Sequence, residues 1–271
     1  MVCEDDKKRF TEICREILTA NCGGEGHTGE GIGTLNEKRM HKVLKRFVCE
    51  DTECHEIDMG NRYVADVMCD GEIYEIQTGS LYPLKKKLEY YIKTTNCHVT
   101  VVHPVPQRKY VIWIDPETGK PRPKTRSPRH PGAVETLAEL IYISELIATG
   151  RVGVWLLMIE EEEYRYLDGW SRDKKRGSNR YERLPVELLD EVALTSPEDY
   201  GEFVPEGLPE EFTAGEFGKQ VKTLRGRDVY LALGTLLNVG VLEPGKGRGR
   251  AKTYRRVPRS ESRHPQKARE L

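Results

Sequence analysis

The chain has 271 residues, a formal net charge of −1 and 37% hydrophobic residues. This length is sufficient for two modest domains, and the composition is typical of a globular protein in water. Since the charges nearly cancel, nucleic-acid binding finds no support in the total charge, and only local basic patches can indicate it. The sequence contains no run of about 18 apolar residues, so we expect no membrane span.

The N-terminus and the cysteines favour a cytoplasmic protein. The start MVCEDDKKRF is acidic and polar, unlike a secretory signal peptide. The seven cysteines are odd in number and lack the spacing of a disulfide framework, which favours a reducing compartment. Cys49, Cys54 and His55 lie close enough to suggest zinc, but no second ligand pair follows at a useful spacing.

The first predicted elements are two helices separated by a glycine-rich loop. Residues 4–20 repeat apolar side chains with helical spacing. The loop NCGGEGHTGEGIG contains the G-x-G-x-x-G pattern of dinucleotide sites, but it follows a helix rather than a strand, which favours a plain loop. A second helix begins near Thr34, and Glu37 lies in its first turn on the inward-facing stripe. Glu37 is either a functional carboxylate or an acid that stabilises the positive end of the helix.

Strands and further helices follow in alternation. The predicted strands cover roughly 62–68, 72–78, 98–103, 109–114 and 153–160. The predicted helices cover roughly 80–95 and 133–149. Residues 168–185 are polar and charge-dense without an apolar period, and they are predicted to form a long exposed loop or linker. The block EEEE at 160–163 is interpreted as a solvated edge.

The segment ADVMCDGEIYEIQTGS, residues 65–80, predicts a β-hairpin. Its Asp70-Gly71 pair is the preferred sequence of a two-residue type I′ turn, which fixes the register and places Asp66 opposite Glu75. One face of the ribbon is then almost wholly apolar: Tyr63, Ala65, Val67, Tyr74, Ile76 and Thr78. The other face carries Asp66, Glu75 and Gln77 beside Val64, Met68 and Ile73.

Two carboxylates in this position call for a physical reason. Directly opposed residues hold their Cβ atoms about 4.5–5.5 Å apart, and like charges placed so are destabilising. A divalent cation would remove that repulsion, and Mg²⁺ is commonly held by one or two carboxylates. The alternative is an ordinary solvent-facing side of a hairpin. The apolar neighbours and the convergence of Asp66, Glu75 and Gln77 favour a site.

The order of these elements resembles the core of the PD-(D/E)XK nuclease superfamily, over roughly residues 34–115. It is similar to members with E-x-Q, as in some restriction enzymes and the competence-protein nuclease family. The resemblance implies an α/β fold with a restriction-endonuclease-like mixed sheet flanked by helices. It also implies that Asp66, Glu75 and the carbonyl of Ile76 hold Mg²⁺ or Mn²⁺. Gln77 would take the place of the usual lysine, and Glu37 that of the accessory acid.

Two residues depart from the pattern of that superfamily. Ala65 stands where a proline often precedes the first acid. Gln77 cannot gain or lose a proton near neutral pH, so it can orient water or phosphate but cannot act as a general base. Lys85 or Lys87 in the following helix would restore the missing charge and contact nucleic acid. A fold that has lost cleavage activity is the alternative.

The C-terminal segment predicts a second unit, over about 210–258. Thr213 is predicted to cap a short helix, with Glu216 completing a capping box, and a second helix opens at Arg227 or Asp228. A basic glycine-rich hairpin follows, and the whole resembles a winged helix-turn-helix. From Lys246 to Leu271 there are ten Lys and Arg against two Glu. The predicted contacts to DNA are Arg225, Arg227, Lys246, Arg248, Arg250 and Lys252. Protein-interaction winged helices and disordered basic tails are the alternatives.

These patterns predict four parts and one leading function. The parts are a nuclease-like domain over 1–165, a linker over 166–208, a winged-helix domain over 209–258 and a basic disordered tail over 259–271. The leading hypothesis is a magnesium-dependent DNA endonuclease, targeted by the winged helix. The alternatives are a non-catalytic DNA-binding regulator with a degenerate nuclease-like domain, and a nuclease acting on RNA.

Overall fold

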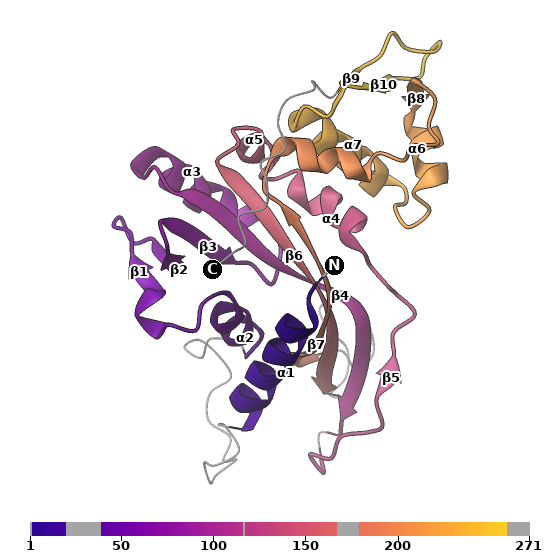
Figure 1. The fold of residues 1–271 in the computed structure, drawn as a ribbon. Helices are drawn as coiled ribbons and strands as arrows, with labels where there is room; N and C mark the ends of the chain where they lie inside the picture. Colours follow the sequence, from indigo (N-terminus) through magenta and orange to yellow (C-terminus); the bar gives the residue numbers. More distant parts are fainter. Residues whose placement is uncertain (1, 20–38, 116, 167–178, 259–271) are drawn as a thin grey trace.

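A mixed sheet with helices on both faces forms the body of the molecule (Figure 1). The computed structural model describes residues 2–19, 39–115, 117–166 and 179–258. The predicted α/β class and the mixed sheet flanked by helices are confirmed. Among the helices of these ranges, none is both long and apolar enough to cross a membrane.

The larger sheet runs in the order β1-β2-β3-β4-β6-β7, and a short β5 pairs with the outer part of β4. Its strands are β1 (His55–Asp58), β2 (Val64–Cys69), β3 (Glu72–Ile76), β4 (His98–Ile114), β5 (Thr125–Arg126), β6 (Val152–Tyr166) and β7 (Asn179–Leu194). The central strands β3, β4 and β6 are parallel, while β2 and β7 run antiparallel to their neighbours. The parallel pairs require crossover connections, which the helices supply.

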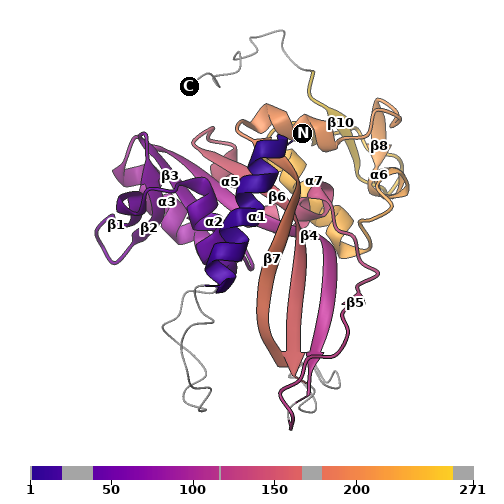
Figure 2. The same ribbon diagram turned by 60° about the horizontal axis from the view of Figure 1, so that its bottom comes forward.

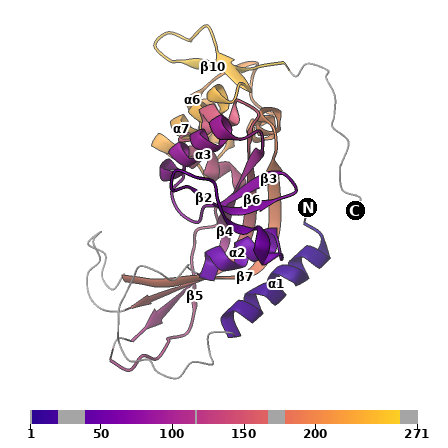
Figure 3. The same ribbon diagram turned by 90° about the vertical axis from the view of Figure 1, so that its left-hand side faces the viewer.

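One face of the sheet is covered by α1 (Glu4–Thr19) and α2 (Arg39–Val48), which lie next to each other in Figure 3. The predicted stripe of α2 is buried, and Phe47 meets Phe10 of α1 edge to face, with ring centroids 5.1 Å apart. Both rings pack with Ile76 and Leu157 of the sheet. The predicted helix over 4–20 is confirmed, whereas Glu37 and the start of the second predicted helix lie outside the described residues, as do the predicted glycine-rich loop and the basic tail.

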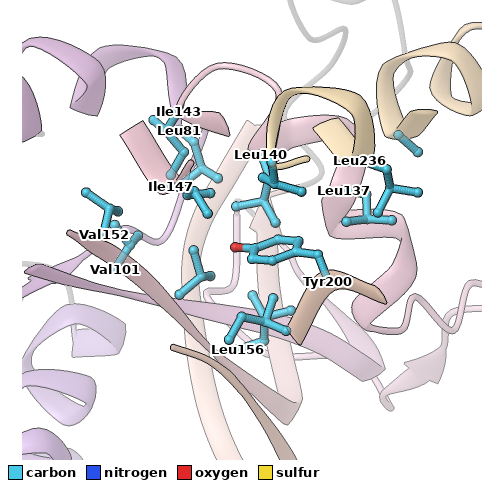
Figure 4. Packing of buried hydrophobic residues seen from close by; sticks show 14 of the residues in the cluster. Leu81, Val101, Leu137, Leu140, Ile143, Ile147, Val152, Leu156, Tyr200 and Leu236 are labelled. Carbon is cyan, nitrogen blue, oxygen red and sulfur yellow. The ribbon is translucent and has the colours of Figure 1, made fainter. Parts of the chain in front are cut away.

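The opposite face is covered by α3 (Lys85–Thr94), α4 (Ala133–Leu140) and α5 (Ser144–Ile147), and α7 (Arg227–Asn238) packs on α4 and α5. A 3-10 turn, η2 (Tyr82–Leu84), leads into α3, and the sequence predicted this helical stretch correctly. The helix predicted over 133–149 is interrupted, because the N–H groups of Tyr142 and Ile143 bond three residues back instead of four. The buried ring of Tyr200, from η3 (Pro197–Phe203), fills the space between the sheet and α4 (Figure 4).

A three-stranded sheet and two helices form the C-terminal part. Its strands follow the order β8-β10-β9 and pack with α6 (Ala214–Gln220) and α7. The strands are β8 (Glu211–Thr213), β9 (Leu242–Pro244) and β10 (Thr253–Arg256). The predicted capping box is confirmed, since the Thr213 hydroxyl accepts the N–H of Glu216 and the Glu216 carboxylate accepts the N–H of Thr213. The start of α7 at Arg227 and the basic hairpin are also confirmed.

Helix α7 joins this part to α4 and α5, which cover the main sheet. Thr235 donates its hydroxyl to the carbonyl of Leu137 at 2.7 Å, and the Asn238 amide donates to the Ser144 hydroxyl at 2.9 Å. One hydrophobic cluster continues from the sheet through α4 to Phe217 of α6. The C-terminal part therefore shares its core with the body of the molecule.

Two predictions about the long strands are wrong. The predicted loop over 168–185 begins outside the described residues, but 179–194 form β7, so this stretch of the predicted linker belongs to the sheet. Its polar sequence misled because β7 is an edge strand with bulges opposite β6, and its charged side chains form ion pairs with residues of other elements. The strands predicted over 98–103 and 109–114 are one strand, β4, whose pairing shifts between Val105 and Arg108.

The acidic block in β6 is a further correction. It is not a solvated edge: Glu161 and Glu163 are 1% and 0% exposed. Lys109 of β4 forms ion pairs with both carboxylates. The neighbouring strands thus supply the charges that allow these acids to be buried.

Candidate active site

The β2–β3 hairpin positions the predicted acids. Asp70 and Gly71 have φ values of +52° and +78°, as a type I′ turn requires. The predicted register is confirmed by the partners Val67 with Tyr74 and Met68 with Ile73. The turn sequence therefore decides which residues of the two strands face each other.

Beyond these pairs the two strands no longer form a ladder. In a continued ladder the N–H of Ile76 would bond to the carbonyl of Ala65. It donates instead to Oδ2 of Asp66 at 2.7 Å. The predicted apolar face fails at the same point, since Ala65 packs with Ile73 in one cluster while Tyr74 and Ile76 pack in the other.

Asp66 lies between the hairpin and α2. Nε2 of His41 is 3.4 Å from Oδ2 of Asp66, and the carboxylate is 18% exposed. Burial alone would raise the pKa of Asp66, but the hydrogen bond and charge of His41, the charge of Lys87 and the N–H of Ile76 together lower it below its usual value. Asp66 is therefore held as a carboxylate.

Glu75 is almost completely buried, at 2% exposed. Its Oε2 accepts from Nζ of Lys87 at 2.6 Å, and its Oε1 accepts the hydroxyl of Tyr91 at 3.0 Å. Burial, and next the charge of Asp66, raise the pKa of Glu75 to about 7, although Lys87 and Tyr91 act in the other direction. Two carboxylates with opposite pKa shifts thus lie close enough for the charge of Asp66 to raise the pKa of Glu75, and such opposite shifts are typical of functional sites.

Helix α3 supplies the positive charge that Gln77 cannot. Lys87 and Tyr91 lie four residues apart on one face of the helix and both reach Glu75. Lys85 bonds to Glu145 at 2.9 Å instead. Of the two lysines that the sequence offered, the structure brings Lys87 into the site and leaves Lys85 on the surface.

Gln77 is fixed by the loop that follows β3. Its side-chain amide donates to the carbonyl of Ser80 at 2.5 Å. The backbone carbonyl of Gln77 accepts from Nδ1 of His103 at 2.6 Å. In the parallel ladder the next backbone donor to that carbonyl would be position 104, which is a proline without an N–H. The His103 ring replaces it, and burial lowers the pKa of this histidine.

The backbone of Ile76 faces Asp66. Glu75 and Gln77 pair with β4, so the N–H and carbonyl of Ile76 point to the other edge of β3. The bond from its N–H to Asp66 shows this directly. Of the donor set predicted for a cation, the Asp66 carboxylate and the carbonyl of Ile76 thus lie on this edge, whereas the Glu75 carboxylate turns toward Lys87 and Tyr91 of α3. Within the described residues, no group of three His, Cys, Asp or Glu side chains is arranged as a metal site.

Four contributors to this region were absent from the predicted site: His41, Tyr91, His103 and Arg183. His41 follows Glu37 by four residues, so the inward placement of Glu37 on a helix would have indicated it. Tyr91 follows Lys87 by four residues in α3, so the choice of Lys87 would likewise have indicated it. Arg183 donates to the carbonyl of Thr78 at 2.7 Å from a strand 105 residues away, and nothing in the local sequence indicates that contact.

The predicted DNA contacts in the C-terminal part are mostly exposed. Arg225, Arg227, Lys246, Arg250 and Lys252 lie on the surface. Arg248 is also exposed, but it bonds to Glu216 at 2.9 Å and to the carbonyl of Glu211. Tyr230, on the outer side of α7, is 64% exposed. These side chains give the helix and the hairpin a basic surface.

With the fold and this site in view, the chain belongs to the family named Domain of unknown function (DUF8091), whose model matches residues 38–195. The match includes the hairpin acids, α3 and the three long strands. An "uncharacterized protein" of Treponema pallidum (strain Nichols) is 25% identical over 234 residues, which cover 86% of this chain and 91% of that protein. No solved structure matches the chain.

Proposed function

We propose that the protein is a metal-dependent endonuclease that hydrolyses phosphodiester bonds in DNA. The observation that carries this proposal is the buried Glu75, which feels the charge of Asp66 at the point where β2 and β3 separate and is in contact with Lys87. The resemblance of this order of elements to the PD-(D/E)XK superfamily supports it. The family match adds no function of its own.

The donor set fits a small divalent cation. Asp66, Glu75 and the carbonyl of Ile76 are oxygen donors, which Mg²⁺ and Mn²⁺ prefer. The raised pKa of Glu75 arises from its burial and next from the charge of Asp66, and a cation between the two acids would relieve both effects. When bound, such an ion would polarise the phosphodiester and lower the pKa of a water molecule.

The remaining side chains would position the carboxylates, the water molecule and the phosphate. Lys87 neutralises Glu75 in the free protein and would donate to a phosphate oxygen when the substrate arrives. His41 and the N–H of Ile76 hold Asp66 ionised in one orientation. Gln77 would orient water or phosphate by hydrogen bonds alone.

The C-terminal part would hold the substrate. Helix α7 with Arg227 and Tyr230 would enter the major groove, and the hairpin with Lys246, Arg250 and Lys252 would follow phosphates, as in winged helix-turn-helix proteins. We place this activity in the cytoplasm, in agreement with the free thiols of the described cysteines.

Plasmid cleavage with single variants tests the proposal. Asp66→Asn and Glu75→Gln should each lower Mg²⁺-dependent or Mn²⁺-dependent cleavage at least about 100-fold, since each removes a charge that the cation needs. Glu72→Gln, on the same hairpin, is the matched control and should cleave like the wild type. Full activity in both site variants would refute the assignment.

A DNA-binding protein without cleavage is the second candidate. Two observations favour it: the Gln77 side-chain amide donates to the carbonyl of Ser80, and Nζ of Lys87 donates to the carboxylate of Glu75. Sequence-selective binding, with no cleavage in Mg²⁺, Mn²⁺ or Ca²⁺, would establish this function in place of the first.

A further inference from the structure

Four basic side chains gather on the two buried glutamates of β6. The group, which we name the basic cluster, lies on β4, β6 and β7, the three long strands that run side by side in Figure 2. Its anions are Glu161 and Glu163. Its cations are Lys109, Arg165, Arg180 and Arg183. The pairs Lys109 with Glu161 and Arg183 with Glu163 are cross-strand partners, so the pleat brings them to one face.

The contacts are close around Glu163 and looser around Glu161. Lys109 and Arg165 bond directly to the carboxylate of Glu163, and Nε of Arg180 is 3.5 Å away. Glu161 has Nζ of Lys109 at 3.4 Å and Nη1 of Arg183 at 3.8 Å. Its Oε1 is buried and, among the described residues, meets no donor in good hydrogen-bond geometry. The arrangement holds the cations in place without satisfying the buried acids fully.

The cluster carries an excess of positive charge. Four cations face two carboxylates. Burial also raises the pKa of Glu161, which favours its neutral form and so reduces the negative charge of the cluster. Lys109, Arg165 and Arg183 are each between 21% and 23% exposed, and Arg180 is 54% exposed. The anions are thus inside and the cations present their outer sides to solvent. Buried acids of this kind cost stability, so a use for the cations that they orient is expected.

The cluster adjoins the candidate active site through Arg183. This side chain donates to the carbonyl of Thr78, the residue after Gln77, while its other nitrogen faces Glu161. A chain of contacts therefore leads from the end of β3 to the tips of the long strands. A strand of nucleic acid seated at Asp66 and Glu75 would reach this surface next.

We propose that the basic cluster binds backbone phosphates of the DNA strand next to the scissile bond, with Arg180 and Arg183 as the principal contacts. This inference rests on the proposed function and adds the place where the substrate is held. Arginine suits the role because its guanidinium forms paired bonds to phosphate and can keep a second bond to a carboxylate.

Binding of DNA without cleavage separates this inference from catalysis. The probe is a fluorescein-labelled duplex of about 20 base pairs in EDTA, followed by anisotropy over a salt series. Arg180→Gln and Arg183→Gln should each weaken binding roughly 3- to 10-fold and lower the slope of log K against log salt by about 1. Arg183→Lys should recover part of the affinity, since it restores the charge.

Arg108→Gln is the matched control. Arg108 precedes Lys109 in β4 and therefore lies on the opposite face, where it forms ion pairs with Glu160 and Glu187. It should bind like the wild type. Arg180 is exposed enough that its variant should fold, and thermal unfolding of each variant verifies this.

Each outcome has a distinct meaning. Weaker binding and a lower salt slope in the Arg180 and Arg183 variants, but not in Arg108→Gln, would support the inference. Unchanged binding in both variants, with loss of binding in Arg227→Gln, would overturn the inference and leave the proposed function intact. A wild-type protein that binds no DNA would overturn both.

Discussion

Substitution of Glu75 by glutamine should change how the stability of the protein depends on pH. Glu75 is buried, and its burial and the charge of Asp66 raise its pKa to about 7, from an ordinary value of about 4.5. The folded protein therefore holds this proton more tightly than the unfolded chain does. A glutamine side chain has nearly the same shape as the protonated acid and no proton to lose.

The size of the effect follows from the two pKa values. Each pH unit between them corresponds to about 1.36 kcal/mol, so the protonation of Glu75 contributes roughly 3 kcal/mol to the free energy of unfolding. Since the pKa of Glu75 is raised in the folded protein, its stabilising contribution is complete below about pH 4.5 and is lost as the pH rises to about 7. Glu75→Gln should therefore gain stability relative to the wild type over this range.

Urea unfolding followed by circular dichroism measures this difference. At about pH 4.5 the two proteins should have similar free energies of unfolding, and near pH 7.5 the variant should exceed the wild type by up to roughly 3 kcal/mol. Saturating Mg²⁺ should reduce that gap, because it would stabilise the ionised Glu75. A difference that stays constant from acid to neutral pH would refute the reasoning about Glu75.

Three further predictions concern separate contacts. Lys87→Gln should lower cleavage at least about 10-fold and raise the pKa of Glu75 further, whereas Lys85→Gln should do neither; a pH profile of cleavage measures both. Thr235→Val leaves the carbonyl of Leu137 without its donor and should cost about 1–3 kcal/mol in urea unfolding, while a cost near zero would show that α7 and α4 are joined by packing alone. Thr213→Ala should cost about 1 kcal/mol through the lost helix cap, Thr213→Asn should cost little, and an equal loss in both would contradict the capping argument.

Local sequence rules predicted the parts of the fold that depend on neighbouring residues. The Asp70-Gly71 pair alone determines the turn and the register of the hairpin, because few turns match the twist of two strands. The capping box of Thr213 and Glu216 is equally local. Both follow from backbone geometry within four residues, which is the range over which sequence patterns are most direct.

Long-range pairing explains what the sequence did not predict. The run EEEE in β6 has the composition of a solvated surface, and only the pairing with β4 and β7 brings Lys109 and Arg183 to it. The strand character of 179–194 was masked for the same reason, because its charged residues are balanced by partners far away in the sequence. Charge density therefore misled wherever the opposite charge lay on another strand.

The candidate site shows the same division. Asp66, Glu75 and Gln77 could be predicted from one hairpin, and the choice of Lys87 over Lys85 needed the orientation of α3 on the sheet. His41 and Arg183 come from other elements, and their contacts depend on the full topology. The anchoring of the Gln77 amide to the loop after β3 also became visible only in the folded chain.

Calorimetric titration of Mg²⁺ and Mn²⁺ tests the central claim most directly. Wild-type protein and the double variant Asp66→Ala/Glu75→Ala are compared near pH 6.5, in two buffers with different heats of ionisation. The proposal predicts one saturable site in the wild type, with release of a proton from Glu75 on binding, and no saturable heat in the double variant. Equal heats in both proteins, or no saturable binding in the wild type, would contradict it.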